Sequence, residues 1–270
     1  MSEGLHLWGA EGARPVLLLH CTLAHGGAWK RVARHLSDRF RLIAPDMVAH
    51  GQGPPGDRAR DFHDQTTEHA AGFLPEAPTH LVGHSFGATV ALRMAIEAPD
   101  RVASLTLFEP VLFAAAPDGS EKRANAETLA RMEPMIAAGD ERDAARLFLS
   151  VWGSGEDFDA LPKGEAARMA AQMWMIPAQR TALHDDKARL LPRLGQVRCP
   201  VLLMEGAASP PVIGQILDTL EAGLSDVRRE KIEGAGHMAP ITHAEEVAAV
   251  LGDFLDAATQ QGAGKRALSG

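Results

Sequence analysis

The chain has 270 residues, 46% of them hydrophobic, and this length suits one α/β domain with an insertion or two small domains. Its formal net charge is -8 with no conspicuous Lys/Arg cluster, so nucleic acid is not an expected partner. No apolar stretch reaches about 18 residues and the start lacks a basic segment before an apolar run, so neither a membrane span nor a signal peptide is predicted.

The first part of the chain alternates between strand-like and helix-like segments. Helical spacing is found at 28–36, 61–74 and 88–98. Strand candidates precede and separate these helices, and most are short apolar runs typical of buried parallel strands: 5–8, 16–19, 41–44, 81–82 and 102–108. The alternation predicts a parallel sheet with helices on both faces.

This alternation stops near residue 112. No strand-like run occurs up to residue 191, and the helical segments there are 120–138, 140–151 and 163–175. Strands resume at 201–204 and 229–232, with a helix at 211–222 between them and a last helix at 244–258. We therefore expect a core built from residues 1–111 and 191–258, an inserted helical cap at 112–190, and a flexible tail at 259–270.

Residues 83–87 read Gly-His-Ser-Phe-Gly and connect the strand at 81–82 to the following helix. Strand, sharp turn and helix is the setting in which Gly-x-Ser-x-Gly forms a nucleophile elbow. Ser85 would then be strained, with its hydroxyl above the sheet, and the helix N-terminus would favour negative charge beside it. The alternative is a glycine-rich turn without chemistry.

Four segments together resemble the α/β-hydrolase family, in the family's order. The elbow at 83–87 is one. The others are the strand and loop around His20 with Trp29, the segment 44–53, which is similar to the family's Asp-x-x-Gly-x-Gly-x-Ser region, and the loop at 234–240. The resemblance covers nearly all of the chain. It implies an α/β-hydrolase fold, with a mostly parallel sheet, helices on both faces and an inserted helical cap.

The resemblance also implies a catalytic triad. A serine hydroxyl needs a base to attack, and His237, in the 234–240 loop, is the candidate base for Ser85. The family usually carries its acid after the strand represented by 201–204, where this chain has Ser209. We predict Glu109 instead, because some family members, including certain haloalkane dehalogenases, carry the acid at that strand end. Asp185, Asp186 and Glu205 remain alternatives.

Two backbone N–H groups should meet the negative charge that develops on the substrate oxygen. The first is that of Phe86, directly after the nucleophile. Cys21 stands where the family usually has glycine, so the second donor is open between Thr22, our first choice, and Leu23. Both cysteines, Cys21 and Cys199, are expected to be free, because they lie at opposite edges of a parallel sheet and are too few for a disulfide framework. A reducing cytoplasm is therefore the expected compartment.

Large apolar side chains of the cap, and Met238 beside the base, are candidates for contacting substrate, since methionine adapts to irregular apolar shapes. The cap candidates are Trp152, Met173 and Trp174, and the alternative for them is an ordinary cap core. His20, Asp46, His50 and His84 are expected to orient loops or pack near the elbow. No metal-ligand spacing is present, so no metal and no cofactor are predicted.

The sequence thus predicts a cofactor-independent serine hydrolase that cleaves a small, largely apolar carboxylic ester or related acyl compound through an acyl-enzyme. A carbon–carbon bond hydrolase, a thioesterase and a lactonase use the same triad and stay open. So does a non-catalytic binding protein or receptor on the same fold. The expected partner is a small molecule. The oligomeric state is left open, with a homodimer as one alternative.

Overall fold

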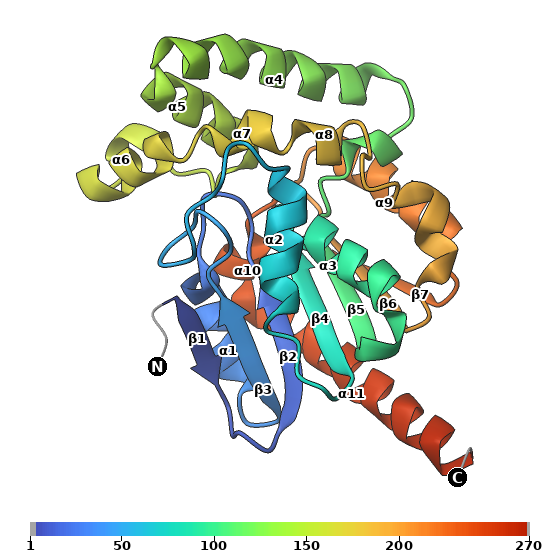
Figure 1. Ribbon diagram of the computed structural model, residues 1–270. Coiled ribbons are helices and arrows are strands. Elements are labelled where there is room, and N and C mark those ends of the chain that lie inside the picture. The colour runs from blue at the N-terminus through green and yellow to red at the C-terminus, as the bar shows by residue number, and fades with distance from the viewer. Residues whose placement is uncertain (1–3, 269–270) are drawn as a thin grey trace.

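A seven-stranded sheet forms the centre of the protein in a computed structural model, which describes residues 4–268 and the side chains up to residue 261 (Figure 1). The strand order is β1-β3-β2-β4-β5-β6-β7, and only β1 runs antiparallel to its neighbour. The bounds are β1 Leu5–Trp8, β2 Arg14–Leu19, β3 Phe40–Pro45, β4 Thr79–His84, β5 Val102–Phe108, β6 Val201–Gly206 and β7 Val227–Ile232. The predicted mostly parallel sheet is confirmed.

Helices cover both faces of this sheet because its strands are apolar on both sides. In β2, Val16 and Leu18 pack in one buried cluster, whereas Leu17 and Leu19 pack in another, as the two-residue strand period requires. The first cluster includes α1 (Lys30–Leu36) and α11 (Ala244–Leu268), and the second includes α2 (Phe62–Ala71), α3 (Phe86–Glu97) and α9 (Val212–Gly223). The sheet therefore has a hydrophobic core on each face, and the carboxyl ends of its parallel strands lie along one edge.

Five helices follow β5 and gather over one end of the sheet (Figure 1). Their bounds are α4 Ser120–Ala138, α5 Glu141–Trp152, α6 Lys163–Ala171, α7 Met175–Ala178 and α8 Arg180–Leu183. The first four of them, α4 to α7, share a third apolar cluster, which includes Leu129, Met132 and Met173, whereas Leu183 of α8 packs in the core cluster. As predicted, no strand occurs between 112 and 191. We call residues 112–190 the cap, although its division from the core remains a prediction.

The prediction that the last helix ends near residue 258 is wrong. Helix α11 continues to Leu268 and so takes up most of the segment that was expected to be a flexible tail. Alanine, glutamine, lysine, arginine and leucine in this stretch are strong helix formers, and they outweigh its glycines. Next to the predicted end, Thr259 Oγ1 lies 3.2 Å from His80 Nε2 of β4, which ties the extended helix to the sheet.

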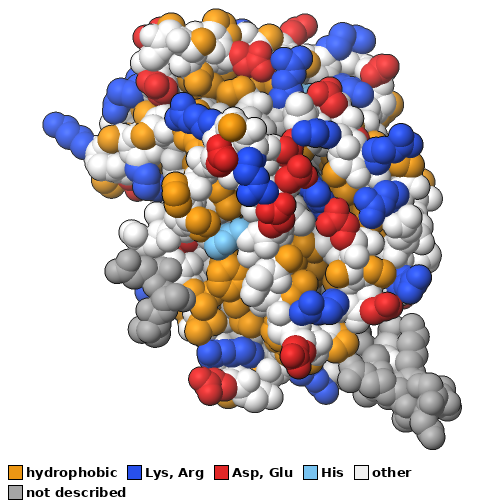
Figure 2. Space-filling model, in the orientation of Figure 1, with side chains coloured by type: hydrophobic (Ala, Val, Ile, Leu, Met, Phe, Trp, Pro, Cys, Tyr) orange, Lys and Arg blue, Asp and Glu red, His pale blue; other side chains and the backbone are white. Residues whose placement is uncertain are grey.

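The surface shown in Figure 2 mixes charges of both signs. Lys and Arg side chains lie among Asp and Glu side chains and do not gather into one basic patch on this face. Within residues 4–268, no helix combines the length and the apolar character that crossing a bilayer demands.

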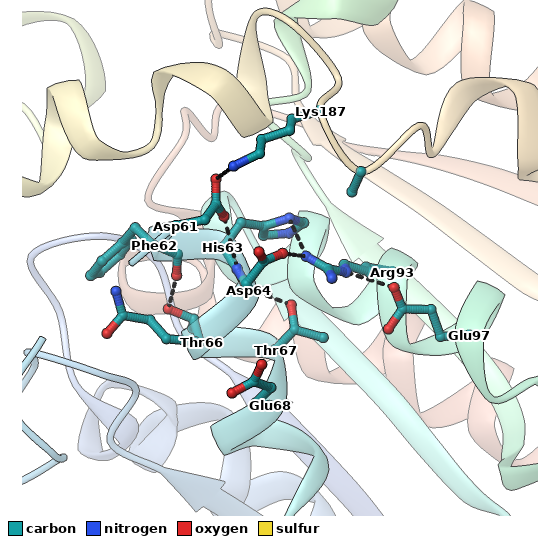
Figure 3. Close-up of polar contacts among 12 residues, drawn as sticks. Asp61, Phe62, His63, Asp64, Thr66, Thr67, Glu68, Arg93, Glu97 and Lys187 are labelled. Carbon is teal, nitrogen blue, oxygen red and sulfur yellow. Dashed lines mark hydrogen bonds and ion pairs between the residues drawn. The ribbon is translucent and has the colours of Figure 1, made fainter. Parts of the chain in front are cut away.

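Polar side chains join α2, α3 and the end of the cap (Figure 3). Arg93 of α3 pairs with Asp64 of α2 at 2.6 Å and with Glu97 at 2.7 Å. Asp61, the residue before α2, accepts a hydrogen bond from Lys187 of the cap at 2.9 Å. Polar contacts thus connect α2 both to α3 and to the end of the cap.

Candidate active site

Ser85 occupies the sharp turn between β4 and α3. Its backbone has φ 58° and ψ −119°, a strained conformation for a residue with a side chain. A Cβ on Gly83 would lie 2.4 Å from Ala88 Cα, and one on Gly87 would lie 2.5 Å from the Leu19 carbonyl oxygen. Only glycine fits at either position. The predicted elbow geometry is therefore present, and the Ser85 hydroxyl makes no capping bond to α3.

His237 lies between Ser85 and Glu109. Its Nε2 is 3.0 Å from Ser85 Oγ, and its Nδ1 is 2.7 Å from Glu109 Oε2. All three side chains are buried, and Glu109 is 0% exposed. Because an ionised carboxylate only accepts hydrogen bonds, Nδ1 donates to Glu109, which leaves the Nε2 of the neutral ring to accept from the serine hydroxyl. This is the arrangement in which a histidine can take the serine proton.

The other oxygen of Glu109 is held by β6 and the loop that follows it. Glu109 Oε1 accepts a hydrogen bond from the Gly206 N–H at 2.7 Å and one from the Ser209 hydroxyl. Glu109 itself has a left-handed backbone, with φ 46°, directly after β5. The carboxylate is thus fixed at both oxygens before any substrate binds.

None of the three alternative acids contacts the His237 ring. Glu205 pairs with Arg229 at 2.9 Å, and Asp186 accepts hydrogen bonds from the N–H groups of Leu190 and Leu191. Asp185 is exposed. The structure therefore brings Glu109, and none of these three, to the His237 ring.

His84 holds the loop that carries His237. Its Nε2 donates to the His237 carbonyl oxygen at 2.8 Å, and the two rings lie 5.0 Å apart. Burial, reinforced by the neighbouring His237, lowers the pKa of His84 well below its usual value, so the ring is neutral. The sequence predicted that His84 packs beside the elbow but gave no sign of this bond, since 153 positions separate the two residues.

Thr22 and Leu23 differ in whether their backbone N–H groups are free. The Leu23 N–H donates to His50 Nε2 at 3.1 Å. Among the described residues, the Thr22 N–H has no hydrogen-bond partner, and Thr22 lies beside Ser85 in the same cavities. The Phe86 N–H belongs to the first turn of α3, where no intrahelical acceptor exists. The geometry thus favours Phe86 and Thr22 over Leu23 as oxyanion donors.

The loops on this side of the site are fixed by neutral histidines and by Asp46. His20 and His50 each donate from Nδ1 to a carbonyl oxygen and accept a backbone N–H at Nε2. Asp46 accepts from the N–H groups of Gly26 and Gln52. These contacts agree with the predicted orienting roles. The two cysteines are buried and free, as expected.

One group within the described residues has side chains suited to a metal ion. Ligand atoms of His6, His25 and Asp46 lie within 4.8 Å of one another. The Asp46 carboxylate is already engaged by the loop N–H groups, and His6 Nε2 lies 3.2 Å from it. The contacts that are present are those of a hydrogen-bonded loop.

Two cavities meet at Ser85. The first encloses about 540 Å³ and the second about 730 Å³, open mouths included, and four residues line both: Thr22, Ser85, Phe148 and Trp152. The Trp152 ring lies 4.9 Å from the His237 ring, and Met238 lines the second cavity. These two predicted substrate contacts therefore lie in the site.

The other two predicted substrate contacts lie elsewhere. Met173 is 0% exposed inside the cap cluster, and Trp174 packs edge-on against Phe62 and beneath the Arg58 guanidinium. Both lie in the short turn after α6. The sequence pattern could not predict which way the side chains of this turn point. Gln179, which no sequence motif marks, is a buried cap residue that lines the first cavity and donates to the Thr22 hydroxyl at 3.0 Å.

Over most of its length, the chain is similar to one family of known proteins. A family model described as the alpha/beta hydrolase family matches residues 16–250. The pimeloyl-[acyl-carrier protein] methyl ester esterase of Methylococcus capsulatus is 33% identical over 256 residues, covering 89% of this chain and 94% of the esterase. Lipase LipV of Mycobacterium tuberculosis is 31% identical over 265 residues, covering 90% of this chain and 94% of the lipase.

The solved structures show the same fold. The haloalkane dehalogenase DbeA-M1 loop variant from Bradyrhizobium elkanii aligns with a TM-score of 0.75 at 20% identity, covering 97% of this chain and 95% of that one. The family model covers most of the chain, and two relatives of over 30% identity align over about nine tenths of it. The chain belongs to the alpha/beta hydrolase family.

Proposed function

We propose that Ser85, His237 and Glu109 are the catalytic triad of a serine hydrolase that cleaves a small, largely apolar carboxylic ester or a related acyl compound. The observation that carries this proposal is the continuous chain of hydrogen bonds from the Ser85 hydroxyl through the His237 ring to the Glu109 carboxylate. A nucleophile needs its base within hydrogen-bond reach and the base needs an orienting group, and both conditions are met.

The mechanism follows from these positions. Ser85 Oγ attacks the acyl carbon while His237 Nε2 takes its proton, and Glu109 stabilises the imidazolium that forms. The N–H groups of Phe86 and Thr22 would stabilise the negative oxygen. His237 then returns the proton to the leaving group. A water molecule activated by the same ring hydrolyses the acyl-enzyme.

The relatives support an oxygen ester as the substrate. The Methylococcus protein is named a methyl ester esterase and the Mycobacterium protein a lipase, and both align over most of their length. The apolar walls of the cavities, with Trp152 above His237, support a largely apolar acyl compound. Thioesters, lactones and carbon–carbon bonds pass through the same triad chemistry and belong in the same assay.

The decisive experiment replaces Ser85 with alanine. Ester turnover by Ser85→Ala should fall by at least roughly 10³-fold with the fold retained, because only a hydroxyl is lost. A fluorophosphonate should label the wild-type protein at Ser85 and leave the variant unlabelled. Ser150, exposed on α5, provides the control, and Ser150→Ala should keep both activity and labelling.

The results separate the alternatives. Retained turnover in purified Ser85→Ala would rule out the serine-hydrolase proposal. A wild-type protein that neither labels nor turns over esters, thioesters, lactones and vinylogous diketones would instead support a binding protein or receptor on this fold.

A further inference from the structure

The two cavities beside Ser85 expose different members of the triad. Ser85 lines both, but His237 lines only the second cavity. Thr22, Phe148 and Trp152 line both and so mark the boundary between the two spaces. A substrate whose acyl carbon reaches Ser85 Oγ must therefore extend into one cavity with its acyl part and into the other with its leaving group.

Proton transfer determines which part goes where. When the tetrahedral intermediate collapses, the bond from carbon to the leaving oxygen breaks and its electron pair goes to that oxygen. The proton held on His237 Nε2 passes to the same oxygen, and the carbonyl forms again on Ser85. The leaving oxygen must then lie within hydrogen-bond reach of Nε2.

We propose that the second cavity holds the leaving alcohol and the first holds the acyl chain. This assignment rests on the proposed Ser85–His237 chemistry and adds the position of each half of the substrate. The substrate enters as an ester spanning both cavities, with its scissile bond beside the boundary residues Thr22 and Trp152.

The first cavity suits an apolar chain. Its walls include Val111, Phe113, Leu129, Met132 and Leu183. Arg180 and His184 also line it, and both belong to a neighbouring surface pocket as well. The cavity therefore leads from Ser85 towards a polar opening, and an unbranched acyl chain lies along it with its far end at that opening.

The second cavity carries charged side chains close to His237. Besides Met238 and Ile241, it is lined by His25, which precedes a short 3-10 helix at Gly26–Trp29, and by Glu165 and Arg168 of α6. A polar alcohol is better matched to these groups than an alkyl one. The substrate class is thus an ester of an unbranched apolar acid with a polar alcohol, such as a glyceryl ester.

Each cavity contains a methionine that can be changed in the same way. Met132 lines only the first cavity and Met238 only the second. Met132→Phe should lower kcat/KM for decanoate relative to acetate esters of one alcohol at least about tenfold, because the ring shortens the acyl cavity. It should change the ratio between glyceryl and methyl butyrate less than about threefold. Met238→Phe should change the ratio between glyceryl and methyl butyrate at least about tenfold. It should change the ratio between decanoate and acetate esters less than about threefold.

The outcomes decide the assignment. Opposite selectivities, with Met132→Phe acting on the alcohol and Met238→Phe on the acyl chain, would overturn it. So would two variants that leave both ratios unchanged while circular dichroism shows native folds. If Met132→Phe does not fold, Met132→Ala must move the acyl preference towards longer chains. A wild-type protein without ester turnover would count against the proposed function itself, which separates the two failures.

Discussion

The α/β-hydrolase family usually carries the acid of its triad after the strand equivalent to β6. In this chain, Glu109 and Ser209 share the role of that single residue. Ser209 follows β6, where an acid was expected, and its hydroxyl donates to the Glu109 carboxylate from the neighbouring strand end. The adjacent Gly206 N–H donates to the same oxygen. The loop after β6 thus supplies orientation, while β5 supplies the charge that the proposed imidazolium needs.

Removing the Glu109 charge tests this division. Glu109→Gln keeps the shape of the side chain, and kcat should fall by roughly 10²–10⁴ because the imidazolium loses its counter-charge. Ser209→Ala should cost less than about tenfold, since it removes one orienting bond only. Steady-state kinetics on one ester measures both. Glu205→Gln, which breaks an ion pair with Arg229, is the matched control and should leave kcat near normal. Near-normal turnover in Glu109→Gln would move the acid elsewhere.

Which site residues could be predicted depended on the kind of signal. Ser85, His237 and Glu109 each follow a recognisable strand end, and parallel strands bring such ends to one edge. Trp152 and Met173 carried the same signal, a large apolar side chain in a helical segment. Only tertiary packing turns Trp152 towards His237 and Met173 into the cap cluster.

At the scale of elements, the helices after β5 are attached to the loops beside Ser85 by polar contacts. Arg168 of α6 donates to the Leu23 carbonyl oxygen, and Gln172, directly after α6, donates to that of Ala49. Gln179 bonds the Thr22 hydroxyl. Helix type and approximate position followed from hydrophobic periodicity, but these contacts join segments more than a hundred positions apart and leave no local pattern. Hydrophobic periodicity thus predicted the helices but not the contacts that join them to the loops.

Asp61 is the attachment most open to a stability test (Figure 3). It caps α2 by accepting the Asp64 N–H at 2.9 Å and it also binds Lys187. Asp61→Ala should lower the free energy of unfolding by about 1 kcal/mol, the usual cost of losing an N-cap. Asp61→Asn keeps a capping oxygen and should cost less, and so should Lys187→Met, which removes only the pairing charge. Urea unfolding at neutral pH measures all three.

The pH dependence of the same site gives a second check. Burial opposes the charge on Asp61, but the hydrogen bonds from Lys187 and the Asp64 N–H prevail and lower its pKa. A lowered carboxylate pKa contributes stability above its unfolded value and loses that contribution as the pH falls through the folded value. The difference between wild type and Asp61→Ala should therefore shrink in acid. A difference that is constant down to pH 3 would contradict the capping role.

At the scale of the whole molecule, the interior contains several neutral histidines. Burial lowers the pKa of His50, His63 and His80 to about 4. The positive charge of Arg93 adds to this effect at His63, and that of Arg14 adds to it at His80. It lowers those of His20 and His84 well below the usual value. The hydrogen bonds agree, because His20 and His50 each accept a backbone N–H at Nε2, and a protonated ring could not.

These rings make the fold sensitive to acid. In the unfolded chain each takes up a proton near pH 6.5, whereas in the folded protein it stays neutral to a lower pH. The unfolded state then binds more protons between those values, so the free energy of unfolding should fall as the pH drops from about 6.5 towards 4. Each histidine contributes up to about 1.4 kcal/mol per pH unit. Urea unfolding at pH values between 5 and 8 should show a plateau above neutrality and a steep fall below it.

His80 offers the variant that isolates one contribution. It lies on β4, bonded to Ser104 Oγ and Thr259 Oγ1, and it lines neither cavity beside Ser85. His80→Gln removes one titrating ring, so the slope of unfolding free energy against pH below 6 should decrease by about 1.4 kcal/mol per unit. Comparing slopes rather than absolute values removes the cost of the substitution itself. An unchanged slope in the variant, or a wild-type free energy that stays level between pH 7 and 5, would mean that these buried rings are not the source of acid sensitivity.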